Sequence, residues 1–172
     1  VMAATSVSFG QTQVFDFRGG SRLKESRART GFSSYVKDPD GITRHMQVVD
    51  PDVNYRTFPA VAAGIKLGHK IAEPPANHLW IDYAGPPDTV PALSFIDVEQ
   101  GKFDPAAVKG KVVVVGATAS ALQDLRTTST TGQQSMTGPE VHANAILTAL
   151  EGFPLQSGPW WVDVLLVVAL GT

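Results

Sequence analysis

The sequence contains no cysteine and few charged residues. The absence of cysteine excludes disulfide bridges, thiolate metal sites and a cysteine nucleophile. Charged residues make up only 17% of the chain and its formal net charge is -2, so the basic surface that nucleic-acid binding requires is not expected. The four histidines show no H-x-x-x-H or other ligand spacing. We therefore predict no metal site, no cofactor and no nucleic-acid partner.

Long apolar runs are also scarce. No run reaches the roughly 20 apolar residues that a membrane span requires. The longest begins at Trp160 and continues to Leu170 around one charged residue, Asp163. Its two leading tryptophans resemble the aromatic belt of a membrane interface. A buried C-terminal helix or strand is one interpretation. We favour the other, in which residues 159–172 begin a transmembrane helix and residues 1–158 form the domain before it.

Phosphate-binding glycine motifs are missing as well. Val112–Val115 is a run of four β-branched residues, which is typical of a central parallel strand covered on both faces, and it is followed by Gly116. Neither G-x-G-x-x-G nor G-x-x-x-x-G-K-[ST] comes next, and "GATAS" does not match the nucleophile elbow G-x-S-x-G. We therefore predict a strand that leads into a turn without a nucleotide motif, and no catalytic residue.

The remaining pattern predicts an α/β fold, a sheet with a central parallel strand flanked by helices. Residues 58–67 have the i, i+3, i+4, i+7 apolar spacing of an amphipathic helix that ends near Gly68. The D-P-D-G sequence at 38–41 predicts a tight turn, and it lacks the further oxygen ligands of a calcium loop. Further strands are expected at residues 1–9, 42–49 and 79–83.

A second helix is predicted near the C-terminal end, after a loop. Residues 126–135 contain no large apolar side chain and predict a mobile surface loop. Thr137 and Glu140 have the capping-box spacing, and Pro139 lies in the first turn. The expected buried stripe is Ala143, Ile146, Leu147 and Leu150, with Glu140, Asn144, Thr148 and Glu151 on the opposite face.

Candidate binding residues lie where the predicted strand, loop and helix meet. In open α/β sheets, ligands bind beyond the carboxyl ends of the strands. Asp124 and His142 could meet across such a crevice. Structural alternatives stay open, because Asp124 can cap a turn or pair with Arg126, His142 can be a hydrogen-bonded core residue, and Asn144 can be solvated or bond to a loop carbonyl. The candidate ligand-binding residues are Thr118, Asp124, Glu140, His142 and Asn144.

Two motifs together resemble a known sensor family. "GKVVVVGATASALQD", a Ser/Thr-rich loop and then "GPEVHANAILTALEG" resemble the C-terminal half of the CHASE domain of the second type, a cyclase/histidine-kinase-associated sensory extracellular domain. The matching positions are G-K and G-A-T-A with the following Asp124, then H-A-N-A from His142. The D-x-D-G turn and the helix at 58–67 extend the resemblance over residues 31–172. Gly138-Pro139 reverses the order typical of the family.

The resemblance implies a signal-input domain without chemistry of its own. It places residues 1–158 on the extracytoplasmic side of the cell membrane, in a bacterial signalling protein such as an adenylate cyclase, a histidine kinase or a Ser/Thr kinase. It also implies that the sheet is incomplete at its N-terminal end. The expected partner is an unidentified extracytoplasmic ligand or protein, with the membrane contacted through the C-terminal segment, and a homodimer is left open.

Two alternatives remain beside this interpretation. One is a soluble α/β enzyme or nucleotide-binding domain with its site at the end of the strand 111–117. The other is a structural oligomerisation module.

Overall fold

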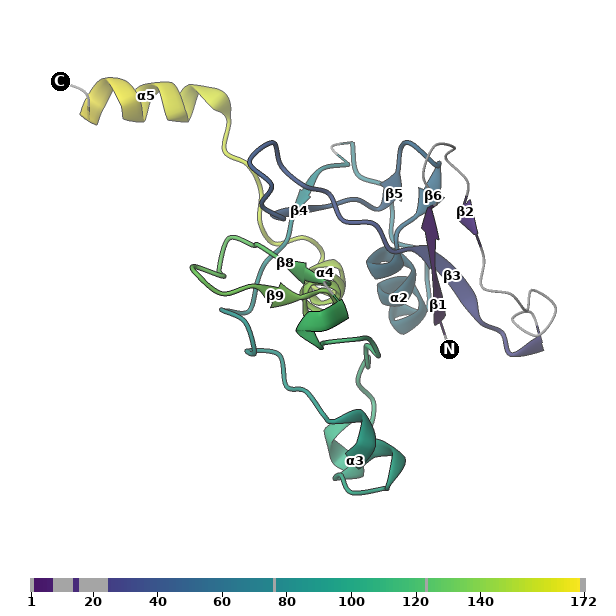
Figure 1. Ribbon diagram of the computed structural model, residues 1–172. Helices are drawn as coiled ribbons and strands as arrows, with labels where there is room; N and C mark the ends of the chain where they lie inside the picture. The colour runs from purple at the N-terminus through teal and green to yellow at the C-terminus, as the bar shows by residue number, and fades with distance from the viewer. Residues whose placement is uncertain (1, 8–13, 16–24, 76, 123, 171–172) are drawn as a thin grey trace.

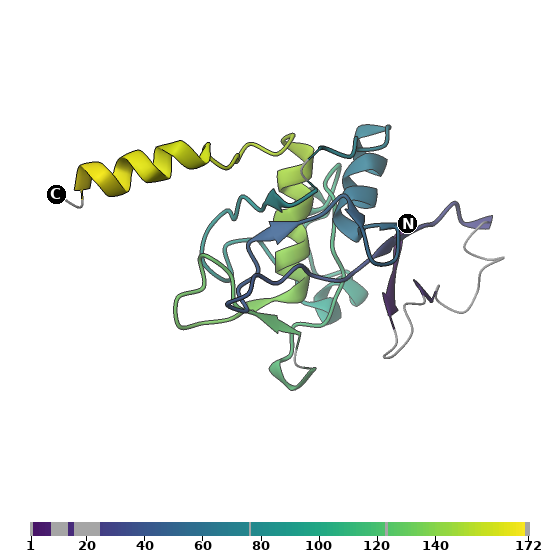
Figure 2. The ribbon, with the colours of Figure 1, turned by 90° about the horizontal axis from the view of Figure 1, so that it is seen from above.

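The computed structural model of the protein describes residues 2–7, 14–15, 25–75, 77–122 and 124–170. Two packed helices form its centre, α2 (Phe58–Leu67) and α4 (Gly138–Leu150). Figures 1 and 2 show them side by side, with short strands around them. Small side chains allow this close approach. The buried alanines at the centre are Ala60, Ala62 and Ala63 of α2 and Ala145 and Ala149 of α4.

The predicted helix at 58–67 is confirmed, including its end. The chain leaves α2 at Gly68, whose positive φ of 78° is a conformation that glycine adopts without steric cost. At the other end of α2, Gly31 lies against the backbone of Phe58. A Cβ on Gly31 would come 2.7 Å from the Cα of Phe58, so a larger residue would separate the strand from the helix.

An N-terminal sheet covers one side of α2. Its central strand, β1 (Met2–Val7), pairs in parallel with β3 (Arg29–Phe32) and antiparallel with β2 (Val14–Phe15). The predicted strand at 1–9 is therefore confirmed over residues 2–7, and its last two residues lie outside the described part of the chain.

Three further strand pairs are antiparallel and only two residues long. The predicted strands at 42–49 and 79–83 are present in part, as β4 and β7. The turn predicted at 38–41 is confirmed, because the N–H of Gly41 donates to the carbonyl of Asp38 at 2.8 Å. The pairs are β4 (His45–Met46) with β7 (Leu79–Trp80), β5 (Val49–Asp50) with β6 (Tyr55–Arg56), and β8 (Leu125–Arg126) with β9 (Met136–Thr137).

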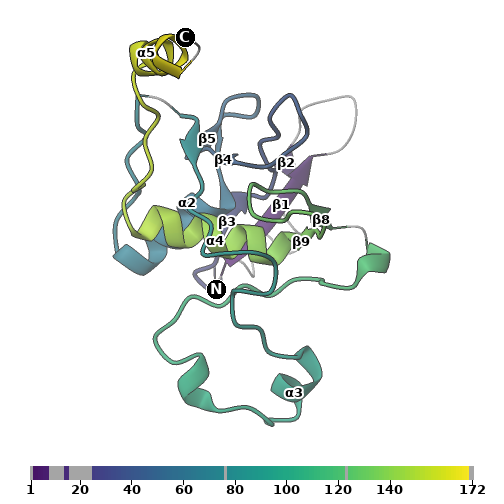
Figure 3. The same ribbon diagram turned by 90° about the vertical axis from the view of Figure 1, so that its left-hand side faces the viewer.

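The prediction of a central parallel strand at Val112–Val115 is wrong. This segment forms no strand and pairs with no described residue, and Val113 and Val115 are 56% and 79% exposed. Valine favours the strand conformation, but a strand needs a neighbour for its backbone hydrogen bonds, and no described strand pairs with this segment. Figure 3 shows that the chain instead makes a wide excursion away from the central helices, which contains the short helix α3 (Phe95–Glu99). Two single 3₁₀ turns, Pro105–Ala107 and Ser120–Leu122, lie in the same excursion.

The prediction of a surface loop at 126–135 is confirmed for most of its residues but not for its centre, and its mobility stays a prediction. Thr128 and Thr131 are buried, at 3% and 4% exposure. Their hydroxyls bond within the turn, since Thr131 Oγ1 accepts from the N–H of Thr128 at 3.1 Å and donates to its carbonyl at 3.0 Å. Polar side chains that satisfy nearby backbone groups can be buried at little cost. The segment is therefore the turn of the β8–β9 hairpin.

The predicted C-terminal helix is confirmed, but its buried stripe is confirmed only in part, with Ile146 buried as predicted. Leu147, predicted to be buried, is 41% exposed, whereas Asn144 and Thr148, predicted on the opposite face, are buried at 1% and 0% exposure. The capping box is absent as well, because Thr137 makes no side-chain cap hydrogen bond. The polar face of α4 therefore faces the interior, where Asn144 and Thr148 accept hydrogen bonds from the backbone of residues 82–84.

The apolar C-terminal segment is helical. It forms α5 (Trp160–Leu170), which projects from the rest of the molecule and has exposed aliphatic side chains, such as Val167 at 71% (Figure 2). Within the described residues, none of the helices combines the length and the apolar character that crossing a membrane requires. The start of a transmembrane helix at 159–172 thus stays a prediction.

Candidate functional site

Glu140 and Asn144 hold the segment that follows β7. The carboxylate of Glu140 accepts hydrogen bonds from the N–H groups of Asp88 at 3.1 Å and Val90 at 3.2 Å. The Asn144 Oδ1 accepts from the N–H of Ala84 at 2.9 Å. These three N–H groups lie outside the strands, so no strand partner supplies their acceptors. Two of the predicted ligand-binding side chains are therefore already engaged in binding the chain itself.

Thr148 extends this arrangement by one more turn of α4. Its Oγ1 accepts from the N–H of Asp82 at 3.0 Å, while the Asn144 side-chain amide donates to the carbonyl of Glu140 at 2.9 Å. Residues four apart lie on one face of a helix, so the three side chains form a single row. We call Glu140, Asn144 and Thr148 the polar ladder. The polar ladder supplies residues 82–90 with the hydrogen-bond acceptors that a neighbouring strand would otherwise provide. This face of α4 is therefore buried against that segment.

Asp124 and His142 belong to one cluster, although no hydrogen bond joins them in the described structure. Asp124 Oδ1 pairs with Arg126 Nη2 at 3.2 Å, which confirms the predicted alternative of an ion pair. The guanidinium of Arg126 lies 4.8 Å from the ring centroid of Tyr35. Tyr35 stacks on His142 with centroids 4.5 Å apart, and Phe58 covers another side of the imidazole at 5.0 Å.

The environment of His142 keeps its imidazole neutral. Burial, with a smaller contribution from the charge of Arg126, lowers the pKa of His142 to about 4. Its Nδ1 is buried and has no hydrogen-bond partner among the described residues. Burial and then the charge of Asp124 raise the pKa of Tyr35, so its hydroxyl stays protonated and donates to the carbonyl of Gly138 at 2.7 Å. The remaining candidate, Thr118, is exposed in the 111–119 segment.

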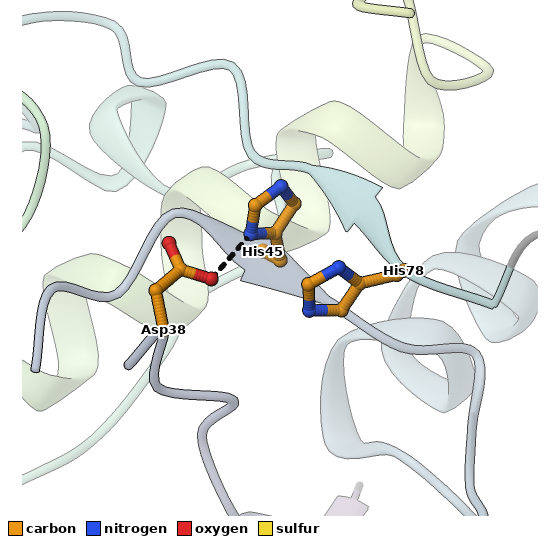
Figure 4. A group of neighbouring side chains, drawn as sticks. All are labelled: Asp38, His45 and His78. Atoms are coloured by element: carbon orange, nitrogen blue, oxygen red, sulfur yellow. Dashed lines mark hydrogen bonds and ion pairs between the residues drawn. The ribbon is translucent and has the colours of Figure 1, made fainter. Parts of the chain in front are cut away.

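A second cluster, which the sequence analysis did not predict, joins β4 to β7. His45 Nδ1 lies 2.8 Å from Asp38 Oδ1, and His78, the residue before β7, stacks on His45 with ring centroids 4.0 Å apart. One potential ligand atom from each of the three side chains lies within 4.8 Å of the others. Figure 4 shows the carboxylate pointing at one imidazole while the second imidazole lies beside the first.

Arg44 fixes the carboxylate of this cluster. Its guanidinium donates to Asp38 Oδ2 at 2.9 Å and also pairs with Asp40 at 2.8 Å. Burial of Asp38 acts to raise the pKa of its carboxyl, but the hydrogen bonds from Arg44 and His45 and their charges outweigh this and lower the pKa below its usual value. Asp38 is therefore ionised at neutral pH, with one oxygen held by Arg44 and the other facing His45.

One cavity in the described part of the molecule has a cationic lining. It has a volume of about 330 Å³ and lies between β3, β6, α2 and the segment after α2. Arg29, Arg56 and Lys70 contribute three positive charges to its lining, and none of them forms an ion pair with a described carboxylate. Arg56 is positioned by a hydrogen bond to the carbonyl of Ile71 at 2.5 Å. A cavity of this size and charge suits a small anionic ligand.

Neither the cavity nor the histidine cluster has a local signal in the sequence. His45 and His78 are far apart in the chain, and the residues next to them have no metal-binding spacing. They meet because β4 pairs with β7 in a register that places His45 opposite Trp80.

A family model for the CHASE2 domain matches residues 3–172, almost the whole chain. The chain belongs to the CHASE2 domain family. CHASE2 domains are sensory, extracytoplasmic parts of membrane proteins and have no catalytic role. The match extends further upstream than residues 31–172, over which the motifs showed a resemblance. No curated protein and no solved structure matches the chain.

Proposed function

We propose that this CHASE2 domain is the signal-input part of a bacterial membrane signalling protein such as an adenylate cyclase, a histidine kinase or a Ser/Thr kinase. Residues 1–158 receive an extracytoplasmic signal, and the apolar segment at 159–172 begins the membrane anchor. The packing of α2 on α4 carries this proposal, because it connects the cationic cavity to the helix that leads toward the C-terminal end.

The signal has a short path through these helices. Ala60, Val61 and Gly64 of α2 line the cavity. On its other side α2 packs on α4, and only residues 151–159 separate α4 from α5. Since small side chains pack closely at this interface, a ligand that shifts α2 must also shift α4. The shift would then reach the apolar helix.

The ligand class follows from the lining of the cavity. Three cations without a described carboxylate partner favour an anion, and the volume of about 330 Å³ lies at the lower end of the range for small-molecule sites. We therefore propose a small carboxylate or phosphate-bearing metabolite. A ligand role for Thr118, Asp124, Glu140, His142 and Asn144 stays a prediction, and for Glu140 and Asn144 it requires the polar ladder to open.

Membrane topology tests the proposed location. A topology reporter inserted at Gly110, an exposed turn residue, is expected to show an extracytoplasmic position in the membrane-bound protein. A second reporter after residue 172 tests whether the segment beyond α5 crosses the membrane. A cytoplasmic position for Gly110 would contradict the proposal.

Anion binding tests the cavity independently. Calorimetric titration of the purified chain with inorganic phosphate and with small dicarboxylates is expected to detect binding by at least one of them. Replacing Lys70 by glutamine should weaken that binding by about tenfold, since a hydrogen bond to a charged group contributes about 1.5–3 kcal/mol. The matched control is Lys109→Gln, an exposed lysine that does not line the cavity. Equal effects of the two variants would exclude the cavity as the binding site.

The two alternatives fare differently. The soluble enzyme with a site at the end of strand 111–117 loses its structural basis, because that strand is absent. The structural oligomerisation module stays a prediction, as does the homodimer, and the exposed apolar side chains of Phe95 and Ile96, at 70% and 58%, are the observation that favours both. Sedimentation equilibrium measures it directly, with Phe95→Ser expected to lower the dimer fraction.

A further inference from the structure

Asp38, His45 and His78 bring together the ligand types that a transition metal ion prefers. Two imidazoles and one carboxylate suit Zn²⁺ and its first-row neighbours, whereas Ca²⁺ and Mg²⁺ select sites made almost entirely of oxygen. Three protein ligands leave the fourth tetrahedral position open to water or another ligand, unlike the closed four-ligand sites of structural zinc. We propose that these three side chains form a binding site for a zinc-like divalent transition metal ion.

The distances are close to what such a site requires. With metal–ligand bonds of about 2.0–2.1 Å, tetrahedral ligand atoms lie about 3.3 Å apart. The three ligand atoms here lie within 4.8 Å of one another, so the widest pair must approach by about 1.5 Å. His78 is exposed and precedes its strand, so its side chain can make this movement. The hydrogen bond between Asp38 and His45 shows that the other two groups already face each other at 2.8 Å.

The charges around the cluster favour a dication. Asp38 and Asp40 carry two negative charges and Arg44 one positive charge, which leaves a net charge of -1 beside the imidazoles. Arg44 holds Asp38 Oδ2 and so aims Oδ1 at the site, as outer hydrogen bonds do for metal ligands.

The cluster is also connected to the C-terminal segment. The His45 ring lies 4.1 Å from the ring of Trp80, with the two planes tilted by 50°. The indole Nε1–H of Trp80 donates to Ser157 Oγ at 2.7 Å, three residues before α5 begins. A metal ion that draws His45 and His78 together therefore changes the contact surface of Trp80. This last step rests on the proposed function, in which α5 leads to the output side.

Calorimetric titration of the purified chain, without a histidine tag, tests the site with Zn²⁺ alone. Because the protein has no cysteine, thiolates cannot supply the binding. We expect one Zn²⁺ per chain, and no displacement by excess Mg²⁺ or Ca²⁺. His78→Ala should lower the affinity at least about tenfold, since even outer-shell changes cost 10–100-fold. The matched control His69→Ala, an exposed histidine outside the cluster, should leave the affinity unchanged.

Two results would overturn the metal site. One is the absence of Zn²⁺ binding at millimolar concentration, and the other is binding that His78→Ala and His69→Ala weaken equally. A second readout keeps the test independent of folding, because His78 is exposed and circular dichroism should show unchanged structure in its variant. The topology of Gly110 does not enter this experiment, so the metal site and the proposed function can fail separately.

Hydrogen exchange tests the connection to α5. Zn²⁺ at saturating concentration is expected to change exchange in residues 153–158 of the wild-type chain, and not in the Trp80→Phe variant, which keeps an aromatic ring but lacks the donor. Exchange that Zn²⁺ leaves unchanged in the wild type would show that the site binds metal without contacting the output side.

Discussion

The side chain of Trp80 donates a hydrogen bond to Ser157, 77 residues further along the chain. This hydrogen bond joins the β4–β7 pair to the segment that precedes α5. Because Trp80 also contacts His45, the histidine cluster, the strand pair and the C-terminal segment form one continuous path.

Removing the hydroxyl of Ser157 is expected to release the segment before α5. The Ser157→Ala variant should exchange amide hydrogens faster in residues 153–158, while α2 and α4 keep their protection, since the lost hydrogen bond is exposed and contributes only about 0.5–1.5 kcal/mol. Mass spectrometry of peptides from the exchanged protein measures both effects. The Ser157→Thr variant retains a hydroxyl and serves as the control. Equal exchange in all three proteins would show that the contact does not restrain the segment.

The lowered pKa of His142 predicts that the folded protein loses stability in mild acid. Its pKa is about 4 in the folded protein and about 6.5 in the unfolded chain, so between these values the unfolded state binds the additional proton. Stability should therefore be complete above pH 6.5 and should fall by on the order of 3 kcal/mol as the pH decreases to 4. Urea titrations across this range measure the effect.

The His142→Phe variant isolates this contribution. It keeps a ring between Tyr35 and Phe58 but cannot be protonated. Its free energy of unfolding should change less between pH 6.5 and pH 4 than that of the wild type. An identical pH dependence in the two proteins would assign the acid sensitivity to other groups.

A side chain on Gly138 is expected to displace the carboxylate of Asp124, which lies directly against it. A Cβ on Gly138 would come 1.9 Å from Asp124 Oδ2, and the N–H of Gly138 already donates to the carbonyl of Asp124 at 2.8 Å. Gly138→Ala should thus destabilise the protein by about 1–3 kcal/mol in thermal or urea unfolding. Gly158→Ala is the control, since a Cβ there meets no atom within 4 Å.

A double variant separates the clash from other effects. In an Asp124→Ala background the carboxylate is gone, so Gly138→Ala should cost less than it does in the wild type. Equal costs in both backgrounds would show that the carboxylate is not what excludes the side chain.

The polar ladder predicts that an apolar replacement of the same shape will destabilise α4. Thr148→Val retains the volume but leaves the N–H of Asp82 without its acceptor, at a cost of about 1–3 kcal/mol. Leu147→Ala, on the exposed side of the same helix, should cost less. Faster hydrogen exchange at Asp82 in Thr148→Val, observed by NMR, would locate the effect. A greater cost for Leu147→Ala would mean that the ladder contributes little.

Several local features could be predicted because they depend only on neighbouring residues. The helix from Phe58 to Leu67 ends where Gly68 permits a positive φ, and the turn at 38–41 follows from its Asp-Pro-Asp-Gly sequence. The G-A-T-A and H-A-N-A motifs indicated the family that the match over residues 3–172 then showed. These inferences need no knowledge of which distant segments meet.

The predictions that failed concern distant contacts. Val112–Val115 has the composition of a buried strand but pairs with no described strand, so Val112, Val113 and Val115 are exposed. Periodicity placed Leu147 inside α4 and Thr148 outside, whereas the backbone of residues 82–90 required the polar face. Composition and spacing thus predicted the two central helices, the turn at 38–41 and the family. Burial and the sites followed from packing, because a hydrogen-bond donor without a strand beside it takes whichever acceptor the fold brings near.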